Sequence, residues 1–562
     1  MSSDSQKDTA HLIVECLEGE GVKYVFGIPG EENIHLVDAL NDSKTIEFVL
    51  TRHEQGASFM ASTYGRLTGM PGGVCLATLG PGAINLMLGV ADAETNSTPL
   101  VALSAQGGLA RLHKESHQVL DLVSMFKPVT QYASMILTPR AVPPEMIRKA
   151  FSTAKRDRPG AAYLAIPQDV EEKPVTAQLK PLKIDPISVT QPTVSDIDKA
   201  VKLIAAAKNP IILAGGDGVL WKHAEQEVQE LSELLDIPVV TTFMSKGVLS
   251  DRHKNALGVV GFMRKDYENF AIDRADMIIS IGFSIQQFDP QRINPHGDKK
   301  IIHINMFRQD VDSHYPVTLN IIANIRASLQ ALLQSLRLQD LHFSHKTAQI
   351  RELIHDELIS GQKSLDVPLK PQTVVYATRK VLPDDAVVLV DTGGAVKMWM
   401  ARLYQTYLSN TCLIDNGLST MAWTLPGAIG AKLARPDKVV VAVMGDGSFL
   451  MNSQEIETAI REKLHLIIVI WEDASYGLIK WKMDMEIKHH NGGVDFDNPD
   501  FVKYAESFGG AHGRQVEKAG DFSRFMQEAV AAKTGVYVIA VPVDYRENMK
   551  LISKLGNTTM RL

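Results

Sequence analysis

Short, continuous apolar runs alternate along this chain with longer segments in which apolar residues recur at helical spacing. In the N-terminal part, the runs that predict strands lie at 24–27, 46–51, 73–78, 100–104 and 161–166. The segments that predict helices lie at 9–20, 32–40, 54–67 and 83–93. Continuous apolar runs are typical of strands that are buried on both faces. The alternation therefore predicts an α/β fold, with a parallel sheet covered by helices on both sides.

The same alternation returns twice further along the chain. Predicted strands lie at 210–214, 238–242, 277–281 and 300–304, and then at 386–390, 439–444, 466–471 and 536–541. Residues 172–195 lack periodicity and contain four prolines, Pro174, Pro181, Pro186 and Pro192, which indicates an extended linker. Residues 340–370 indicate a helix followed by a proline-bearing connection. We therefore expect three doubly wound parallel-sheet domains, at 1–172, 195–337 and 365–548.

Composition and charge exclude several classes of function. A chain of 562 residues is too long for a single hydrophobic core. Its net charge of −7 disfavours nucleic acid and anionic membranes as partners. The three cysteines, Cys16, Cys75 and Cys412, provide no disulfide framework, which favours a reducing compartment. Because there is also no signal segment and no membrane-length apolar run, we expect a cytoplasmic protein without nucleic-acid or membrane partners.

The most informative residues follow two predicted strands of the third domain. The strand at 439–444 leads into Gly445-Asp446-Gly447-Ser448, and the strand at 466–471 leads into Glu472-Asp473. Since the carboxyl ends of neighbouring parallel strands lie side by side, Asp446 and Asp473 are expected to converge, although 27 positions separate them. Two carboxylates and a backbone carbonyl form half of an oxygen shell suited to Mg²⁺, which a diphosphate would complete.

The backbone around these acids also fits a phosphate ligand. Gly445 and Gly447 allow phosphate oxygens to approach closely. A helix, expected from Asn452 with Glu455 at capping-box spacing, adds N–H donors. An isolated Gly-Asp-Gly is more often only a tight turn, so the order strand, turn, helix, strand, acid is what favours a binding site.

This order resembles the fingerprint of the thiamine-diphosphate enzyme family, in which Gly-Asp-Gly is followed further along by two asparagines. Here Glu472-Asp473 replaces that pair, and an aspartate remains a good Mg²⁺ ligand. The resemblance implies that Asp446, Asp473 and the carbonyl of Ser475 bind Mg²⁺. It also implies that thiamine diphosphate contacts Gly445, Gly447, Ser448, Tyr476, Gly477 and Leu478.

The N-terminal domain resembles the same family at 25–30, 52–55, 64–69 and 79–82. Taken alone, Glu54 is an acidic residue in the first turn of a helix, which usually only stabilises the helix dipole. The resemblance implies instead that Glu54 bonds N1′ of the cofactor's aminopyrimidine and promotes loss of the thiazolium C2 proton, beside Pro81 and Asn85. In this family the glutamate domain of one subunit faces the diphosphate domain of another, which implies a homodimer or homotetramer with the active site at the subunit interface.

The resemblance is closest to the catalytic subunits of acetolactate synthases, on residues 83–86, 117–118, 416–421 and 541–545. It implies that Met421 bends the cofactor and that the Ser419 carbonyl holds its 4′-amino group. It also implies that Gln118 and Gly30 lie near the reacting carbonyl. The implied reaction decarboxylates pyruvate and joins the hydroxyethyl unit to a second 2-oxo acid, which gives 2-acetolactate. Whether this reaction serves branched-chain amino acid or acetoin metabolism stays open.

Two departures leave the fate of the substrate open. Trp423 stands where small residues are usual, and Lys482, after Trp481, stands where a glutamine is common. These residues are expected to line the substrate pocket with His117. Lys482 either holds a substrate carboxylate or is a solvated helix lysine. An altered pocket favours a second hypothesis, a non-oxidative 2-oxo acid decarboxylase that releases aldehyde, including from longer-chain substrates.

Other classes of protein fit less well. A non-catalytic regulator on this scaffold is disfavoured because Glu54, Asp446 and Asp473 are all present. A nicotinamide dehydrogenase is disfavoured because Gly-Gly-Asp-Gly at 215–218 does not complete Gly-x-Gly-x-x-Gly. The middle domain resembles the FAD-holding domain of biosynthetic acetolactate synthases, but residues 282–290 are closer to the FAD-independent catabolic forms. We therefore expect no FAD.

Overall fold

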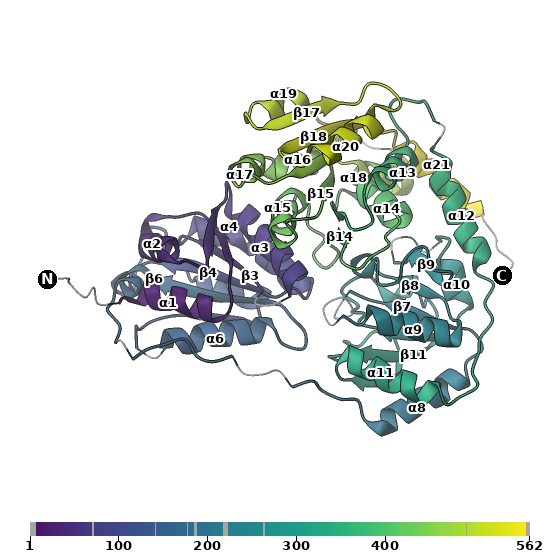
Figure 1. The fold of residues 1–562 in the computed structure, drawn as a ribbon, viewed down its shortest axis with the longest axis horizontal. Coiled ribbons are helices and arrows are strands. Elements are labelled where there is room, and N and C mark those ends of the chain that lie inside the picture. The colour runs from purple at the N-terminus through teal and green to yellow at the C-terminus, as the bar shows by residue number, and fades with distance from the viewer. Residues whose placement is uncertain are drawn as a thin grey trace. The chain divides into compact units, whose positions relative to one another are not determined.

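The computed structural model describes residues 7–69, 72–140, 142–176, 178–184, 188–216, 223–261, 263, 265–362, 364–489 and 492–557. The described residues contain three six-stranded sheets in which every strand pair is parallel (Figure 1). The chain forms two compact units. The first contains residues 1–187 with 425–437 and 452–464, and the second contains the remainder of the chain.

The sheet of the first unit has the strand order β2-β1-β3-β4-β6-β5. Its strands are β1 (Tyr24–Gly27), β2 (Glu47–Leu50), β3 (Gly73–Ala77), β4 (Leu100–Gln106), β5 (Tyr132–Met135) and β6 (Ala161–Pro167). On one face, an apolar cluster joins the sheet to α1 (Thr9–Gly19), α2 (Ile34–Asp42) and α6 (Val142–Ala154). On the other face, α3 (Glu54–Thr68) and α4 (Pro81–Thr95) pack together against β3 and β4. The short helices α5 (Leu122–Phe126) and α7 (Gln168–Glu171) complete this part.

Two helices from the last third of the chain also belong to the first unit. These are α17 (Glu455–Arg461) and most of α15 (Thr424–Ala434). A side chain at Gly430 would overlap the backbone of Met60 in α3, so the two helices approach as closely as a glycine allows. Below them, the Arg435 guanidinium donates a hydrogen bond of 2.8 Å to the Leu67 carbonyl.

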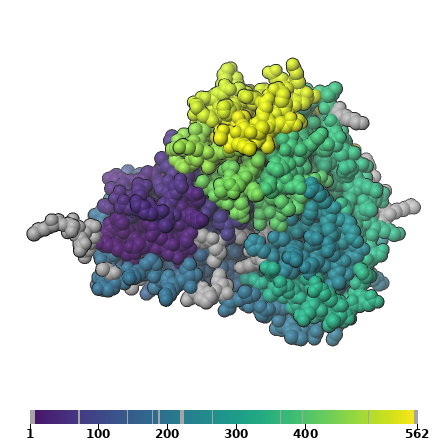
Figure 2. Space-filling model, in the orientation of Figure 1, coloured from purple at the N-terminus to yellow at the C-terminus, as the bar shows by residue number. Residues whose placement is uncertain are grey.

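The central sheet, in the second unit, has the strand order β12-β11-β10-β7-β8-β9, the arrangement of dinucleotide-binding sheets. Its strands are β7 (Pro210–Ala214), β8 (Val239–Thr241), β9 (Ala256–Val259), β10 (Met277–Ile281), β11 (Lys300–Asn305) and β12 (Val317–Ile322). One face packs on α8 (Val194–Ala205), α9 (Glu225–Leu235) and α11 (Ile325–Leu336), which lie at the molecular surface in Figures 1 and 2. The short α10 (Asn269–Arg274) precedes β10.

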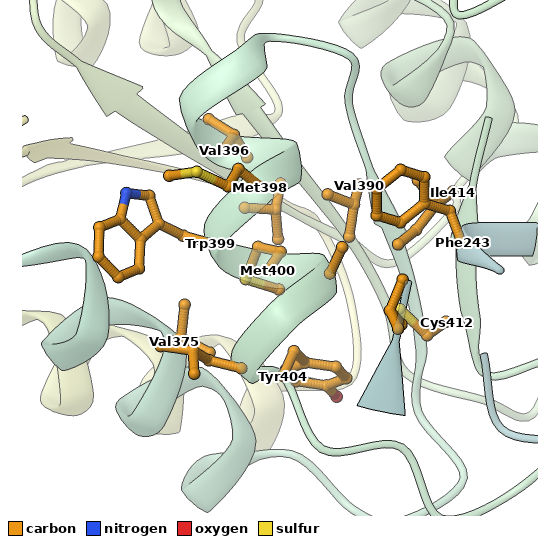
Figure 3. Packing of buried hydrophobic residues seen from close by; sticks show 14 of the residues in the cluster. Phe243, Val375, Val390, Val396, Met398, Trp399, Met400, Tyr404, Cys412 and Ile414 are labelled. Carbon is orange, nitrogen blue, oxygen red and sulfur yellow. The ribbon is translucent and has the colours of Figure 1, made fainter. Parts of the chain in front are cut away.

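The C-terminal sheet has the strand order β14-β13-β15-β16-β18-β17. Its strands are β13 (Val387–Val390), β14 (Cys412–Ile414), β15 (Val440–Gly445), β16 (Leu466–Glu472), β17 (Ala511–Gln515) and β18 (Val536–Pro542). The other helices of this region are α12 (Ala348–Ile359), α13 (Pro371–Val381), α14 (Gly394–Leu403), α16 (Asp446–Asn452), α18 (Gly477–Glu486), α19 (Phe501–Glu506), α20 (Asp521–Ala532) and α21 (Glu547–Asn557). Buried α14 lies within the core of this region, with Trp399 on the side of Val375 and with Val390 and Cys412 on the other side of the helix (Figure 3).

Each strand predicted from the sequence is present, within a residue or two at its ends. The strands that the sequence did not predict are β5, β9, β12, β14 and β17, and all of them lie at a sheet edge. Between α7 and α8, the described residues contain only an isolated bridge from Pro174 to Asp8, as expected of a linker. None of the described helices is long and apolar enough to span a membrane. The limits of the three predicted domains stay a prediction.

Candidate functional site

The predicted residues of the third domain meet at the carboxyl ends of β13 and β15. These adjacent strands mark the point where the strand order reverses, which is where ligands bind in open α/β sheets. A cavity of about 450 Å³ opens there. The predicted residues that line it are Ser419, Met421, Gly445, Asp446, Gly447, Ser448, Asp473, Ser475, Tyr476, Gly477 and Leu478. The lining residues that sequence reasoning missed are Thr392, Gly393, Val396, Met451, Ile479 and Tyr545.

Asp446 is buried and ties the ends of β15 and β16 together. One carboxylate oxygen accepts the N–H of Gly447 at 2.8 Å. The other accepts the N–H groups of Asp473 and Ala474 at 3.0 and 2.7 Å, and an amide hydrogen of Asn498 at 2.8 Å. Asp446 is therefore hydrogen-bonded directly to Asp473, 27 residues further along the chain, as expected for the ends of neighbouring parallel strands.

Asp473 lies beside Asp446 in the same cavity. Burial, with the nearby Asp446 carboxylate as a smaller cause, raises the pKa of Asp473 to about 7 despite a 2.7 Å hydrogen bond from the Ser475 hydroxyl. One buried and one half-buried carboxylate at one point favour a divalent cation. In the described ranges no three His, Cys, Asp or Glu side chains come together as a metal site. A cation held here would need backbone and ligand oxygens to complete its shell.

Glu472, which replaces the first asparagine of the family fingerprint, does not line the cavity. Its carboxylate accepts a 2.7 Å hydrogen bond from the Gln515 amide on β17, and burial raises its pKa. The substitution therefore leaves the cavity wall to Asp473.

The cavity floor has room and donors for a phosphate-bearing ligand. A side chain at Gly445 would meet no atom within 4 Å, and one at Gly393 would come no nearer than 3.8 Å to the Gly445 backbone. The buried hydroxyl of Thr392 has no hydrogen-bond partner among the described residues. Open space between two glycines beside an unpaired hydroxyl fits a diphosphate group.

The helix after Gly-Asp-Gly begins earlier than predicted. It starts at Asp446, and Asn452 is its last residue instead of its cap. Glu455 begins a separate helix, α17, without the expected capping box. The strand therefore passes directly into a helix, which places Gly447 and Ser448 in the first turn, where backbone N–H groups lack helical partners.

Met421 lies in a loop that holds it against the cavity. Its neighbours Ser419 and Ala422 have φ values of +61° and +70°, a region that costs energy for residues other than glycine. The loop is fixed from below, because the Ser448 hydroxyl accepts the Ala422 N–H at 2.8 Å and buried Lys397 donates to the Ser419 hydroxyl at 2.7 Å. Strain held by such contacts is characteristic of functional sites.

Asp391, at the end of β13, completes this support. It is fully buried, and its carboxylate accepts hydrogen bonds from the hydroxyls of Thr424, at 2.7 Å, and Ser448. Burial raises the pKa of Asp391. A single carboxyl thus connects the segment that follows Met421 to the sheet, directly at Thr424 and through Ser448 at Ala422.

In the first unit, the structure brings Glu54 and Asn85 together. Glu54 is the first residue of α3 and is half-buried, and its carboxylate accepts a 3.0 Å hydrogen bond from the Asn85 amide. A side chain at Gly82 would lie 3.1 Å from the other Glu54 oxygen, so the start of α4 approaches this carboxylate closely. Pro81 is the first residue of α4.

Gly30 and Gln118 lie on either side of the turn that follows β3. A side chain at Gly30 would overlap Thr78, and one at Gly80 would lie 2.7 Å from the Gln118 carbonyl. Gln118 is exposed and has a φ of +60°. His117 is also exposed, and its carbonyl accepts a 2.8 Å hydrogen bond from Arg111.

The remaining substrate-pocket candidates do not line the cavity. Trp423 and Trp481 are buried, and their indole N–H groups have no partner within the part of the chain that the structure describes. Lys482 is exposed on α18. Their role in a substrate pocket stays a prediction.

Comparison with known proteins identifies the family. Three family models match: thiamine pyrophosphate enzyme, N-terminal TPP binding domain, at 7–125; thiamine pyrophosphate enzyme, central domain, at 197–332; and thiamine pyrophosphate enzyme, C-terminal TPP binding domain, at 392–541. This chain belongs to the thiamine pyrophosphate enzyme family. Thiamine pyrophosphate is another name for thiamine diphosphate.

Within this family, the chain is similar to acetolactate synthases over nearly its whole length. It is 34% identical to acetolactate synthase of Bacillus subtilis (strain 168), over 97% of this chain and 94% of that protein. It is 34% identical to the catabolic acetolactate synthase of Raoultella terrigena, over 97% of each. It is also 34% identical to a probable acetolactate synthase large subunit of Methanococcus aeolicus, over 93% of this chain and 90% of that protein. The matched N-terminal TPP binding domain contains Glu54, and the C-terminal one contains Asp446 and Asp473.

Proposed function

We propose that this protein is an acetolactate synthase that uses thiamine diphosphate and Mg²⁺. It removes CO₂ from pyruvate and joins the remaining two-carbon unit to a second 2-oxo acid. The observation that carries the proposal is the cavity at the ends of β13 and β15, where the carboxylates of Asp446 and Asp473, an open glycine floor and the Met421 loop meet. The similarity to proteins named acetolactate synthase supports the choice of reaction.

The cavity residues divide the work of holding the cofactor. Asp446, Asp473 and the Ser475 carbonyl bind Mg²⁺, because hard oxygens are the ligands this ion prefers. The backbone at Gly393 and Gly445 admits the diphosphate. Thiamine diphosphate, when bound, supplies an electron sink for the carbon that loses CO₂.

The first unit contributes the proton chemistry. Glu54 holds a proton at N1′ of the aminopyrimidine, while its second oxygen stays bonded to the Asn85 amide. In the second unit, Met421 contacts the cofactor from a loop that hydrogen bonds hold in place. Both roles need groups whose positions are fixed before the cofactor arrives.

Joining is favoured over simple release of aldehyde. Release requires a proton donor at the reacting carbon, and Gln118, beside Gly80, is a neutral amide that does not supply one. The test is product analysis with pyruvate and cofactor. Acetolactate as the main product is expected, and free aldehyde as the main product would instead favour a 2-oxo acid decarboxylase.

The assembly follows from the same division of labour. We propose a homodimer or homotetramer in which Glu54 of one subunit serves the cavity of the next. Exposed apolar side chains around the cavity, on Leu450, Met451, Tyr476 and Ile479, support a face that a second subunit covers. Sedimentation with cofactor tests this, and an active monomer would contradict it.

We also propose that the central domain works without FAD. A side chain at Gly215, after β7, would overlap the backbone of Gly282 and Phe283, so little room remains where β7 and β10 end. Asp217 and Gly218, the rest of the glycine-rich segment, lie outside the described residues. The visible absorbance of the purified protein tests this, because bound flavin is yellow.

A further inference from the structure

A buried carboxyl group of the first unit has no role in the mechanism above. Glu455 is the first residue of α17, and its side chain is fully buried. One oxygen accepts the backbone N–H groups of Arg52 and His53 at 3.1 and 3.0 Å. The other accepts the Thr458 hydroxyl at 2.6 Å and shares the Arg52 N–H at 3.2 Å. Every oxygen of this carboxyl is therefore used.

The two N–H groups that Glu455 accepts belong to the residues directly before Glu54. His53 is the N-cap of α3, and its ring nitrogen accepts the Gln55 N–H at 3.0 Å. Helices leave their first N–H groups without partners, so a local cap satisfies only some of them. Here Glu455, 403 positions further along the chain than Arg52, accepts the N–H groups of Arg52 and His53, directly before the helix. The backbone at the start of α3 is thus fixed both by its own cap, His53, and by Glu455.

Position 56 is shaped for the same contact. A side chain at Gly56, in the first turn of α3, would overlap the Glu455 carboxylate. Glycine costs helix stability, so its place here reflects the close approach of Glu455. Burial also raises the pKa of Glu455 to about 7, and such a costly group is retained for a specific contact.

We propose that Glu455 is a positioning residue for Glu54. It fixes the Arg52–His53 backbone, which in turn fixes where the Glu54 carboxyl can reach. Because Glu455 follows Asp446 by nine residues, one short stretch of chain contains both the proposed metal ligand and the residue that places the proposed acid. The inference rests on the proposed function of Glu54. Small displacements of a reacting group are enough to matter, since a shift of about 1 Å can cost about a hundredfold in rate.

The test uses the full-length enzyme with Glu455→Met, which keeps the length of the side chain but removes both oxygen acceptors. Gly56→Ala displaces the same carboxylate, and Glu457→Met on the same helix is the matched control. We expect kcat to fall about ten- to a hundredfold in the first two variants. The KM for pyruvate and the Kd for thiamine diphosphate with Mg²⁺ should change little, whereas the melting temperature should fall in both variants because a buried contact is lost or overlapped. Unchanged kcat in both variants would overturn the inference.

Hydrogen exchange gives a readout that is independent of turnover. In the unmodified enzyme the Arg52 and His53 amides should exchange slowly, and in Glu455→Met they should lose that protection while the rest of α3 keeps it. Rapid exchange of both amides in the unmodified enzyme would overturn the inference even if neither variant folds. A purely structural role for Glu455 would lower the melting temperature but leave kcat of the folded enzyme unchanged.

A double variant separates this inference from the proposed function. If Glu455 acts through Glu54, adding Glu455→Met to Glu54→Gln causes no further loss of kcat. Losses that multiply would contradict the inference and leave the role of Glu54 intact. Normal activity in Glu54→Gln alone would contradict the proposed function itself.

Discussion

The N-terminal and C-terminal sheets share one topology but differ at the same point. Both have their third strand beside their first, in the orders β2-β1-β3-β4-β6-β5 and β14-β13-β15-β16-β18-β17. The registers agree as well, since Gly27 pairs with Leu76 and Val390 pairs with Val443. Two residues beyond each pairing stand Thr78 in one sheet and Gly445 in the other.

The difference between Thr78 and Gly445 decides which sheet has an open crevice at the ends of its first and third strands. Thr78 fills the space beside Gly30, and its hydroxyl donates a 3.1 Å hydrogen bond to buried Glu32. Around Gly445 there is nothing within reach of a side chain. The same fold therefore gives a packed crevice in one sheet and a ligand cavity in the other. In the N-terminal domain the candidate chemistry lies on α3 instead, at Glu54.

The largest effect is expected when the charge of Asp446 is removed from the open crevice of the C-terminal sheet. Asp446→Asn keeps an acceptor for the Gly447 N–H but loses the charge that a cation needs. We expect the affinity for Mg²⁺ and thiamine diphosphate to fall together, by about a hundredfold or more, since even outer groups of metal sites are worth about ten- to a hundredfold. Calorimetric titration measures this. The control is Glu472→Gln, outside the cavity, and equal losses in both variants would refute the assignment.

The second prediction concerns the N-terminal domain, whose sheet has a packed crevice. Glu54→Gln should lower kcat by about 10²–10⁴, the usual range for a lost general acid or base. Cofactor binding should be nearly unchanged, because the cradle lies in the other sheet. Steady-state rates with a parallel titration check this. A variant that loses binding but keeps its rate at saturation would reverse the roles of the two sheets.

The third prediction compares the same substitution, glycine to alanine, in the two crevices. Gly445→Ala puts a methyl group into open space, so the melting temperature should hold while cofactor affinity falls roughly ten- to a hundredfold, equivalent to about 1–3 kcal/mol. Gly30→Ala overlaps Thr78 and should lower the free energy of unfolding by about 1–3 kcal/mol. Thermal unfolding and titration on both variants show whether the effects separate. Destabilisation in Gly445→Ala would mean that its crevice is packed.

The smallest effect is a dependence on pH. Asp391 directly follows β13, as Ile28 follows β1, and burial raises the pKa of Asp391. Because the native state holds this proton more tightly than the unfolded chain, its stabilisation is complete below the ordinary pKa of about 4 and is lost as pH rises through the native value. Asp391→Asn should therefore lose less stability as pH rises. Denaturant unfolding across this range measures it, with Asp385→Asn as control, and parallel curves for wild type and Asp391→Asn would contradict it.

Strand prediction from the sequence succeeded in the sheet interiors, and among the edge strands it succeeded only for β2. Interior strands such as β16 are continuous apolar runs because helices cover both faces. The missed β17 reads Ala-His-Gly-Arg-Gln, and β12 alternates buried with exposed side chains. One side of an edge strand meets solvent or a loop, so its residues need not be apolar.

The cavity was predictable where a motif marks it. Gly-Asp-Gly and the acid after β16 led to most of its lining, but Thr392 and Gly393 follow β13 without a distinctive pattern. The only available signal was their place after an apolar strand. Glu455 was misassigned as part of a helix cap, because its true partners, Arg52 and His53, lie some 400 positions away. Such distant contacts leave no local spacing to recognise.

The membership of α15 and α17 in the first unit has a consequence for how the protein is made. On the ribosome, α3 is complete by Thr68, yet its packing partners at Gly430 and Glu455 emerge only after the whole central domain. Until then the backbone at the start of α3 lacks its hydrogen-bond acceptor, Glu455, and α3 lacks its packing contact with α15. The N-terminal domain is therefore synthesised first but finished last, and cutting the chain at the 172–195 linker would leave it incomplete.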